Sequence, residues 1–197
     1  QLRSLGLTIL YRQVDVACEP EVQALIAEVS ENFGNIDGVL HCAGVLSDNF
    51  IIKKTAQEFT QVFAPKISGV LNLDRATAHI NLGFFVMFSS AAGSWGSAGQ
   101  ADYACANAFL DSFSHYRNEQ LRRSERQGRT IAINWPLWSE GGMRMEANAQ
   151  VMMRHKTGMT ALTSEAGLRA FYQAIASGNA QMMVLYGQVS RLRLGLE

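Results

Sequence analysis

The 197-residue sequence predicts an α/β fold with a doubly wound parallel sheet, and three observations support this. Apolar stretches of strand length alternate along the chain with stretches whose apolar residues recur at helical spacing. Hydrophobic residues make up 48% and charged residues 17% of the chain, which is enough for one sizeable buried core. No internal repeat or low-complexity linker divides the sequence. We therefore predict one domain over residues 1–197, with strands joined by parallel crossovers.

The first half of the chain contains two predicted strands and two predicted helical segments. Leu7–Val14 is rich in apolar, β-prone residues and predicts a strand, and Glu19–Phe33 has apolar residues at helical spacing. Ile36–Ala43 is a short apolar strand that leads into a glycine. A longer helical segment runs from about Thr55 to Ala78. Pro65 lies inside it, and we expect a break or kink there because proline has no backbone N–H.

The central part of the chain has the most strongly apolar strand. Phe84–Ser90 reads FFVMFSS, a nearly continuous run that is typical of a strand covered on both faces. A loop rich in glycine and serine (Ala91–Gln100) separates it from Tyr103–Gln127, which we predict to be one long helix. Thr130–Trp135 is predicted to be another buried strand.

The last third of the sequence differs in texture. Residues 138–160, approximately, are rich in glycine, methionine and polar residues, which suits a mobile lid better than a core layer. Thr163–Ser177 is amphipathic with Ser164 as its expected N-cap, and Met182–Tyr186 is the last predicted strand. Methionine packs adaptably, so the lid methionines would suit an acyl chain of variable shape.

Charge and cysteine usage exclude several classes of protein. The 17 basic and 17 acidic residues give zero net charge, which argues against nucleic acid or an anionic membrane as the main partner. No apolar run approaches the ~20 residues that a membrane span needs, and Gln1–Leu10 does not resemble a secretory signal. The cysteines are odd in number and lack CxxC spacing, so we expect free thiols in a cytoplasmic protein. The four histidines lie far apart and give a metal site little support.

One motif of dinucleotide-binding folds does not occur in these 197 residues. Such folds begin with a strand, a GxGxxG turn and a helix, whose N-terminus holds the pyrophosphate. Here the first predicted strand is followed directly by Asp15. Either the fold binds no dinucleotide or this chain lacks the first βαβ unit. The polar residues described next favour the second interpretation.

Four polar residues are spaced so that they can meet. Ser90 ends a buried strand, Tyr103 follows it by 13 residues, and Asn107 lies four residues further on. Residues four apart share a helix face, so Tyr103 and Asn107 point the same way. Lys66 precedes Ser90 by 24 residues. Ser89 competes with Ser90 for the serine position, and the 13-residue spacing selects Ser90.

These side chains suggest acid–base chemistry on a carbonyl. Tyrosine has an ordinary pKa of about 10, and a neighbouring ammonium favours the phenolate and lowers that pKa. A serine hydroxyl beside the tyrosine can hold a substrate oxygen. The group could therefore polarise a carbonyl and deliver a proton while a cofactor delivers hydride.

With these residues the chain resembles the ketoreductase domains of modular polyketide synthases, which belong to the short-chain dehydrogenase/reductase superfamily and have a Rossmann-type fold. The order Lys66, Ser90, Tyr103, Asn107 is similar to the ketoreductase arrangement. Three segments also match family motifs: VDV (Val14–Val16), HCAGV (His41–Val45) and INWPLWSEGGM (Ile133–Met143). The texture is most similar to bacterial trans-acyltransferase assembly lines.

The resemblance implies a function and a set of site residues. It implies NADPH-dependent reduction of the β-keto group of a thioester held on an acyl carrier protein, with an N-terminal remainder and neighbouring synthase domains as further partners. Tyr103 would donate the proton, Ser90 would bind the carbonyl oxygen, Lys66 would tune Tyr103, and Asn107 would place Lys66 or a relay water. The implied cofactor-binding residues are Asp15, Val16, Ala43, Gly44, Val45, Lys66, Tyr103, Pro136 and Leu137.

Stereocontrol and two other functions stay open at this stage. The resemblance associates Asp48 with one configuration of the product hydroxyl and Trp95 with the opposite configuration. The configuration associated with Asp48, a D-configured hydroxyl, is favoured. Met143 is the third residue that the resemblance assigns to substrate binding and stereocontrol. One alternative is a non-reducing structural or epimerising domain on the same scaffold. The other is a free-standing dehydrogenase. The basic run Arg117–Arg129 is interpreted as a solvated helix face rather than a carrier-protein contact.

Overall fold

The computed structural model describes residues 2–143 and 145–194 and has a four-stranded, fully parallel sheet. The strands are β1 (Gly38–His41), β2 (Phe84–Ser90), β3 (Arg129–Trp135) and β4 (Gln181–Met183), in that spatial order. In register, Phe84 lies opposite Gly38 on one side and Arg129 on the other. Because each crossover is helical, this confirms the predicted α/β, doubly wound arrangement.

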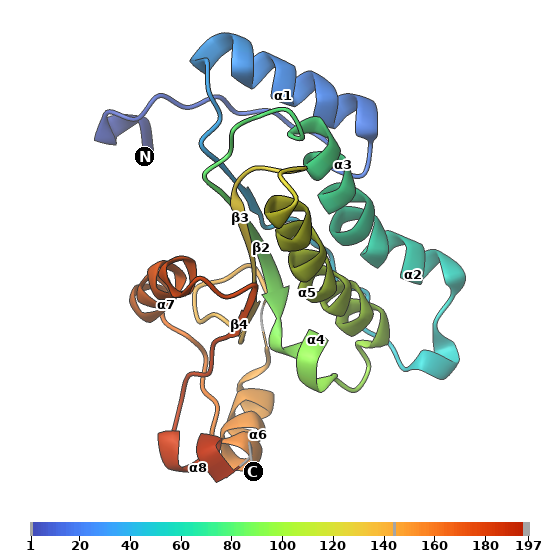
Figure 1. Ribbon diagram of the computed structural model, residues 1–197. Helices are drawn as coiled ribbons and strands as arrows, with labels where there is room; N and C mark the ends of the chain where they lie inside the picture. Colours follow the sequence, from blue (N-terminus) through green and yellow to red (C-terminus); the bar gives the residue numbers. More distant parts are fainter. Residues whose placement is uncertain (1, 144, 195–197) are drawn as a thin grey trace.

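Helices cover both faces of this sheet. Figure 1 shows α1, α3 and α5 on one side and α7 on the other, with α6 and α8 beyond the C-terminal end of the sheet. The helices and helical turns are η1 (Leu2–Leu5), α1 (Glu19–Phe33), η2 (Ile51–Lys53), α2 (Ala56–Phe63), η3 (Ala64–Ser68), α3 (Gly69–Ala76), α4 (Ala91–Trp95), α5 (Ala101–Arg122), α6 (Ala147–Thr157), α7 (Ser164–Ser177) and α8 (Val189–Leu194).

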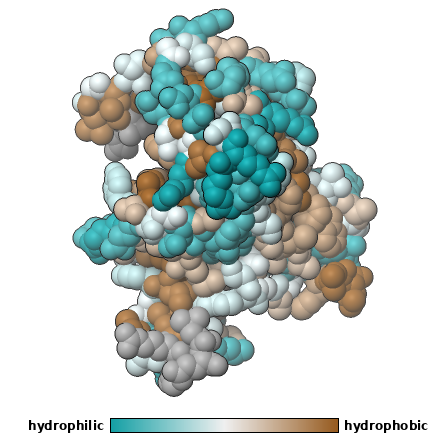
Figure 2. Space-filling view, in the orientation of Figure 1, coloured by the Kyte–Doolittle hydropathy of each residue, from teal (hydrophilic) through white to brown (hydrophobic). Residues whose placement is uncertain are grey.

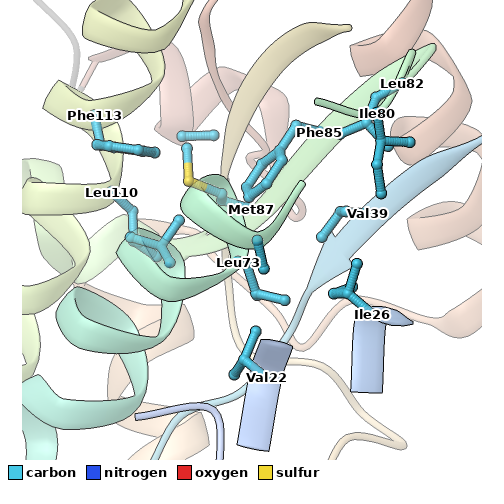
Figure 3. Packing of buried hydrophobic residues seen from close by; sticks show 13 residues of the cluster. Val22, Ile26, Val39, Leu73, Ile80, Leu82, Phe85, Met87, Leu110 and Phe113 are labelled. Atoms are coloured by element: carbon cyan, nitrogen blue, oxygen red, sulfur yellow. The ribbon is translucent and has the colours of Figure 1, made fainter. Parts of the chain in front are cut away.

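The alternation of side chains along β2 divides the core into two layers. Phe85 and Met87 point toward α1, α3 and α5, while Val86 and Phe88 point toward α7. Alternate residues of a strand face opposite sides, so one apolar run can fill both layers. The larger layer also contains Val22, Ile26, Val39, Leu73, Leu110 and Phe113, which converge in Figure 3.

A buried arginine connects the helical layer to the sheet. Arg117 of α5 is fully buried and donates to the Asp74 carboxylate of α3 at 2.7 Å. Its guanidinium also donates to Thr130 Oγ1 at 2.8 Å. The backbone carbonyls of Gln127 and Gly128 accept from the same guanidinium. This part of the predicted basic helix face is therefore structural and not solvated.

Two predicted elements are wrong. Leu7–Val14 forms no strand, because no neighbouring strand within the described residues pairs with it; Val14 still packs on the core. The loop Ala91–Gln100 contains a helix, α4, which Ser90 caps by accepting from the backbone N–H of Ala92 at 3.2 Å.

Other predicted bounds needed small corrections. The long central helix ends at Arg122 rather than Gln127, and β4 ends at Met183. The N-cap of α7 is Thr163, not Ser164; its hydroxyl accepts from the backbone N–H of Ala166. Within the described ranges, no helix is long and apolar enough to span a membrane.

The surface is mixed, with an apolar protrusion at η2. Figure 2 shows hydrophobic side chains gathered beside the start of α2, where η2 lies. Phe50, Ile51 and Ile52 form this protrusion, and Ile52 is 88% exposed.

Candidate active site

The carboxyl ends of the parallel strands bring the predicted residues to one edge of the sheet. β1 ends at His41 and leads into Ala43, Gly44 and Val45, while β3 ends at Trp135 and leads into Pro136 and Leu137. β2 ends at Ser90, between them. In open α/β sheets this edge is where ligands bind.

Lys66 reaches this edge from a π-helical turn. The predicted break at Pro65 is a local change of helix type: α2 continues through η3 into α3 without leaving the helical path. Pro65 has no N–H for an α-helical hydrogen bond, and single π-helical turns of this kind are frequent at functional sites. Lys66 is 3% exposed, and its ammonium donates to the carbonyl of Phe88 at 2.9 Å. Gly44 leaves room for it, since a Cβ there would lie 3.0 Å from Lys66 Cε.

The tyrosine and the serine meet beside this lysine. Lys66 Nζ lies 5.7 Å from the centroid of the Tyr103 ring, and the Ser90 side chain lies close enough to the Tyr103 hydroxyl to lower its pKa. The two serines differ in their contacts. Ser89 is buried and donates to the carbonyl of Asn107 at 3.2 Å, whereas Ser90 is the serine whose side chain acts on the Tyr103 hydroxyl.

The expected lowering of the Tyr103 pKa is wrong in this structure. Burial raises the pKa of Tyr103, and the side chains of Ser90 and Asn107 offset this only in part. The ammonium of Lys66 lies over the ring and donates to the Phe88 carbonyl rather than to the Tyr103 hydroxyl. Tyr103 is therefore held as a phenol, the form that can donate a proton.

Asn107 lies one helical turn beyond Tyr103, on the predicted shared face. Its Nδ2 donates to the Tyr103 carbonyl at 2.7 Å, and its Oδ1 is buried without a partner among the described residues. Gly93 of α4 permits this close approach, because a Cβ there would lie 2.9 Å from Asn107 Cβ.

Two of the three predicted substrate residues, Met143 and Asp48, act on the Tyr103 hydroxyl. Met143 Sδ accepts from the Tyr103 hydroxyl at 3.8 Å, and the charge of Asp48 acts on the same hydroxyl. Asp48 accepts from Gln100 at 2.9 Å, which ties its loop to the start of α5. Trp95 is half exposed at the end of α4. Beside Met143, a pocket of about 330 Å³ lies under the predicted lid, lined by Leu137, Trp138, Met143, Met145 and Gln150 among others.

The predicted adenine-side residues lie apart from this group. Asp15 is held locally, where its Oδ1 accepts from the backbone N–H of Ala17 at 2.9 Å. Val16 packs against Gly69, and its carbonyl accepts from Asn72 at 3.0 Å. No described contact joins either residue to Lys66 or Tyr103.

The sequence prediction missed two buried polar groups next to the site. Asp111 and Asn134 are joined by a 2.8 Å hydrogen bond behind Asn107. Lys54 forms a buried ion pair with Asp102, which precedes Tyr103. Asp111 continues the spacing of Tyr103 and Asn107 by another four residues, and that signal was available in the sequence. No group of residues suited to a metal ion occurs within the described ranges.

Comparison with known proteins places this chain in a family. A family model described as the KR domain matches residues 1–140. The chain belongs to the KR domain family. It is 46% identical to the polyketide synthase PksL and 44% identical to PksN, both of Bacillus subtilis (strain 168), over 98% of its own length. It spans only 4% of the length of each of these proteins.

Solved KR structures agree with this fold. A ketoreductase domain from the bacillaene assembly line matches with a TM-score of 0.97 and 43% identity, over 100% of this chain and 47% of that one. An N-terminal ketoreductase from the macrolactin assembly line matches with a TM-score of 0.89 and 39% identity, over 100% and 37%. The family and the α/β Rossmann-type fold implied by the resemblance are thus confirmed, and the Bacillus relatives agree with the trans-acyltransferase texture.

Proposed function

We propose that this chain is the catalytic part of a ketoreductase domain of a polyketide synthase, where it reduces the β-keto group of a carrier-bound thioester to a hydroxyl. The observation that carries this proposal is the convergence of Lys66, Ser90 and Tyr103 at the carboxyl edge of the sheet. Membership of the KR domain family supports ketoreduction as the reaction type.

The residues around Lys66 and Gly44, at the carboxyl edge of the sheet, suit a nicotinamide cofactor. Lys66 has three N–H donors, one of which the Phe88 carbonyl accepts, so two remain for a ribose. The glycine at position 44 allows a close approach of the backbone, and Ala43, Val45, Pro136 and Leu137 would border the ring. Asp15 and Val16 would meet the adenine side. The phosphates need a glycine-rich loop, which we propose lies in an N-terminal remainder of the domain, and NADPH is the proposed form.

The side chains then divide the reaction between them. When bound, the cofactor supplies a hydride to the carbonyl carbon. Ser90 and Tyr103 donate hydrogen bonds to the carbonyl oxygen, and Tyr103 gives that oxygen its proton. The ammonium of Lys66, over the ring, stabilises the phenolate that remains. Asn107 holds the Tyr103 backbone and so fixes the tyrosine in position.

The substrate would enter under the lid. The pocket of about 330 Å³ next to Met143 is within the size range of small-molecule sites. Its methionines, Met143 and Met145, can adapt to acyl chains of different shape. Asp48 and Trp95 are the proposed stereocontrol residues, with the Asp48 hand favoured. An acyl carrier protein would present the thioester.

The test is NADPH oxidation with a short β-ketoacyl thioester. It is run on this chain and on an extended domain, meaning this chain preceded by a strand, a glycine-rich turn and a helix. We expect turnover only in the extended domain. NADPH binding without turnover would indicate an epimerising domain instead, and an extended domain that binds no NADPH would contradict the proposal.

A further inference from the structure

The loop that carries Asp48 is fastened to the start of α5. We call residues 47–54 the Asp48 loop. The backbone N–H of Asn49 donates to the carbonyl of Gly99 at 2.9 Å, and the Asp48 carboxylate accepts from Gln100, the N-cap of α5, at 2.9 Å. The contact of Asp48 with Gln100 is exposed, and water competes for such hydrogen bonds, so it holds the loop only weakly.

A buried ion pair completes this attachment. Lys54, the last residue of the loop, pairs with Asp102 of α5, and the two side chains are 0% and 1% exposed. The Lys54 ammonium also donates to the backbone carbonyl of Ser47, the first residue of the loop. It lies 5.8 Å from the centroid of the Phe59 ring of α2. One side chain therefore joins both ends of the loop to two helices.

The carboxylate of Asp102 connects this attachment to the tyrosine. Its Oδ1 accepts from the backbone N–H of Tyr103 at 2.9 Å, while its Oδ2 pairs with Lys54. Asn107 holds the other side of the same residue, because its Nδ2 donates to the Tyr103 carbonyl at 2.7 Å. The two oxygens of one carboxylate thus hold the Asp48 loop and the backbone of the tyrosine.

Burial of this pair favours one position of the loop. Taking two charges out of water has a cost that their attraction only roughly offsets, so a buried pair adds little stability over apolar side chains of similar size. If the loop moves away from α5, however, Lys54 and Asp102 lose each other as partners, and an unpaired buried charge is costly. The pair therefore selects the arrangement in which loop and helix are in contact.

We propose that Lys54 is a positioning residue that fixes the Asp48 loop against the start of α5 and thereby selects the configuration of the product hydroxyl. The inference rests on the proposed function, in which Tyr103 gives the proton and Asp48 controls configuration. The Lys54 side chain is fully buried, so it acts through Asp102 and Ser47 and not on the substrate. In a loop released from α5, Asp48 would have no fixed position relative to Tyr103, and the carbonyl could present either face.

The first test measures the attachment itself in the complete 197-residue chain. Lys54→Met combined with Asp102→Asn removes both charges, so neither is left buried and unpaired, and the amide oxygen at position 102 can still accept from the Tyr103 N–H. We expect the Asn49 amide hydrogen to exchange at least about tenfold faster by NMR, while the amides of β2 keep their rates. Lys53→Met, which removes the exposed neighbouring charge, should leave the Asn49 rate unchanged. An unchanged Asn49 rate in the double variant, or an equal acceleration in β2, would overturn the proposal.

The second test determines the product configuration in the extended domain. With a short β-ketoacyl thioester, the double variant should raise the fraction of the minor hydroxyl configuration at least about fivefold, measured by chiral chromatography. Lys54→Arg keeps the charge and should retain most of the wild-type ratio. Lower turnover with an unchanged ratio in the double variant would indicate a merely structural role and overturn the proposal. Faster Asn49 exchange in a domain that shows no turnover would support the attachment by Lys54 and refute the ketoreductase.

Discussion

At the residue scale, the site depends on an ammonium and a phenol whose pKa values are shifted by burial. Lys66 and Tyr103 are both buried, and burial moves each toward its neutral form. Folding must therefore supply the free energy that keeps Lys66 protonated. That cost is measurable as a dependence of stability on pH.

The pKa of Lys66 gives a prediction with a definite sign. The folded pKa of about 8 is below the ordinary lysine pKa of 10.5, so between these values the unfolded chain binds more protons. The free energy of unfolding should therefore rise with pH in this window, by roughly 2–3 kcal/mol relative to Lys66→Met. Urea denaturation at pH 7 to 10.5 measures it. The exposed neighbour Lys53 provides the control, since Lys53→Met should follow the wild type.

At the element scale, the site depends on how closely α4 approaches α5. Ser90 caps α4, and Gly93 in the same helix lies against Asn107 and the backbone of Ala108. Any side chain at position 93 must push the two helices apart, because a Cβ would lie 3.0 Å from the Ala108 nitrogen.

We expect Gly93→Val to destabilise the fold by about 1–3 kcal/mol, the usual cost of overpacking. It should also impair the site, since Asn107 and Ser90 lie on the two helices that separate. Gly142→Val is the matched control, because a Cβ at position 142 meets nothing within 4 Å. Denaturant midpoints of the two variants measure the difference, and equal midpoints would show that the α4–α5 contact tolerates a side chain.

At the scale of the whole molecule, the Arg117 network joins α3, α5 and the turn before β3. Arg117 is fully buried and has Asp74 as its carboxylate partner, which Arg126 shares at 3.1 Å. Removing one partner of a buried pair leaves the other charge uncompensated.

Asp74→Ala should therefore lower the free energy of unfolding by about 3–5 kcal/mol, measured by urea denaturation at pH 7. Glu119→Ala removes an exposed carboxylate that pairs with Arg122 and Arg123 and should lower the free energy of unfolding far less, because water screens exposed ion pairs. A loss for Asp74→Ala no larger than that for Glu119→Ala would refute the structural role of the network.

Sequence patterns predicted the features that local chemistry determines. The helix Glu19–Phe33 and the strand Phe84–Ser90 have the predicted bounds, because apolar spacing alone defines them. Leu7–Val14 was predicted wrongly, since a strand also needs a partner. The raised pKa of Tyr103 follows from burial and from where Lys66 points, which spacing cannot give.

In the site too, local spacing was predictable from the sequence, whereas contacts between distant residues were not. The spacing of Lys66, Ser90, Tyr103 and Asn107 placed four residues that the fold does bring together. The pair of Asp111 with Asn134 joins residues 23 apart in sequence, and the pair of Lys54 with Asp102 joins residues 48 apart. Only the tertiary structure makes such pairs visible.

The central claim is that the Tyr103 hydroxyl gives its proton to a substrate carbonyl. The most direct measurement is turnover of a β-ketoacyl thioester by the extended domain with Tyr103→Phe, alongside its urea denaturation. We predict that kcat falls by about 10²–10⁴, the usual contribution of one acid–base group, while the unfolding midpoint stays near that of the wild type. Normal turnover by a folded Tyr103→Phe domain would contradict the account.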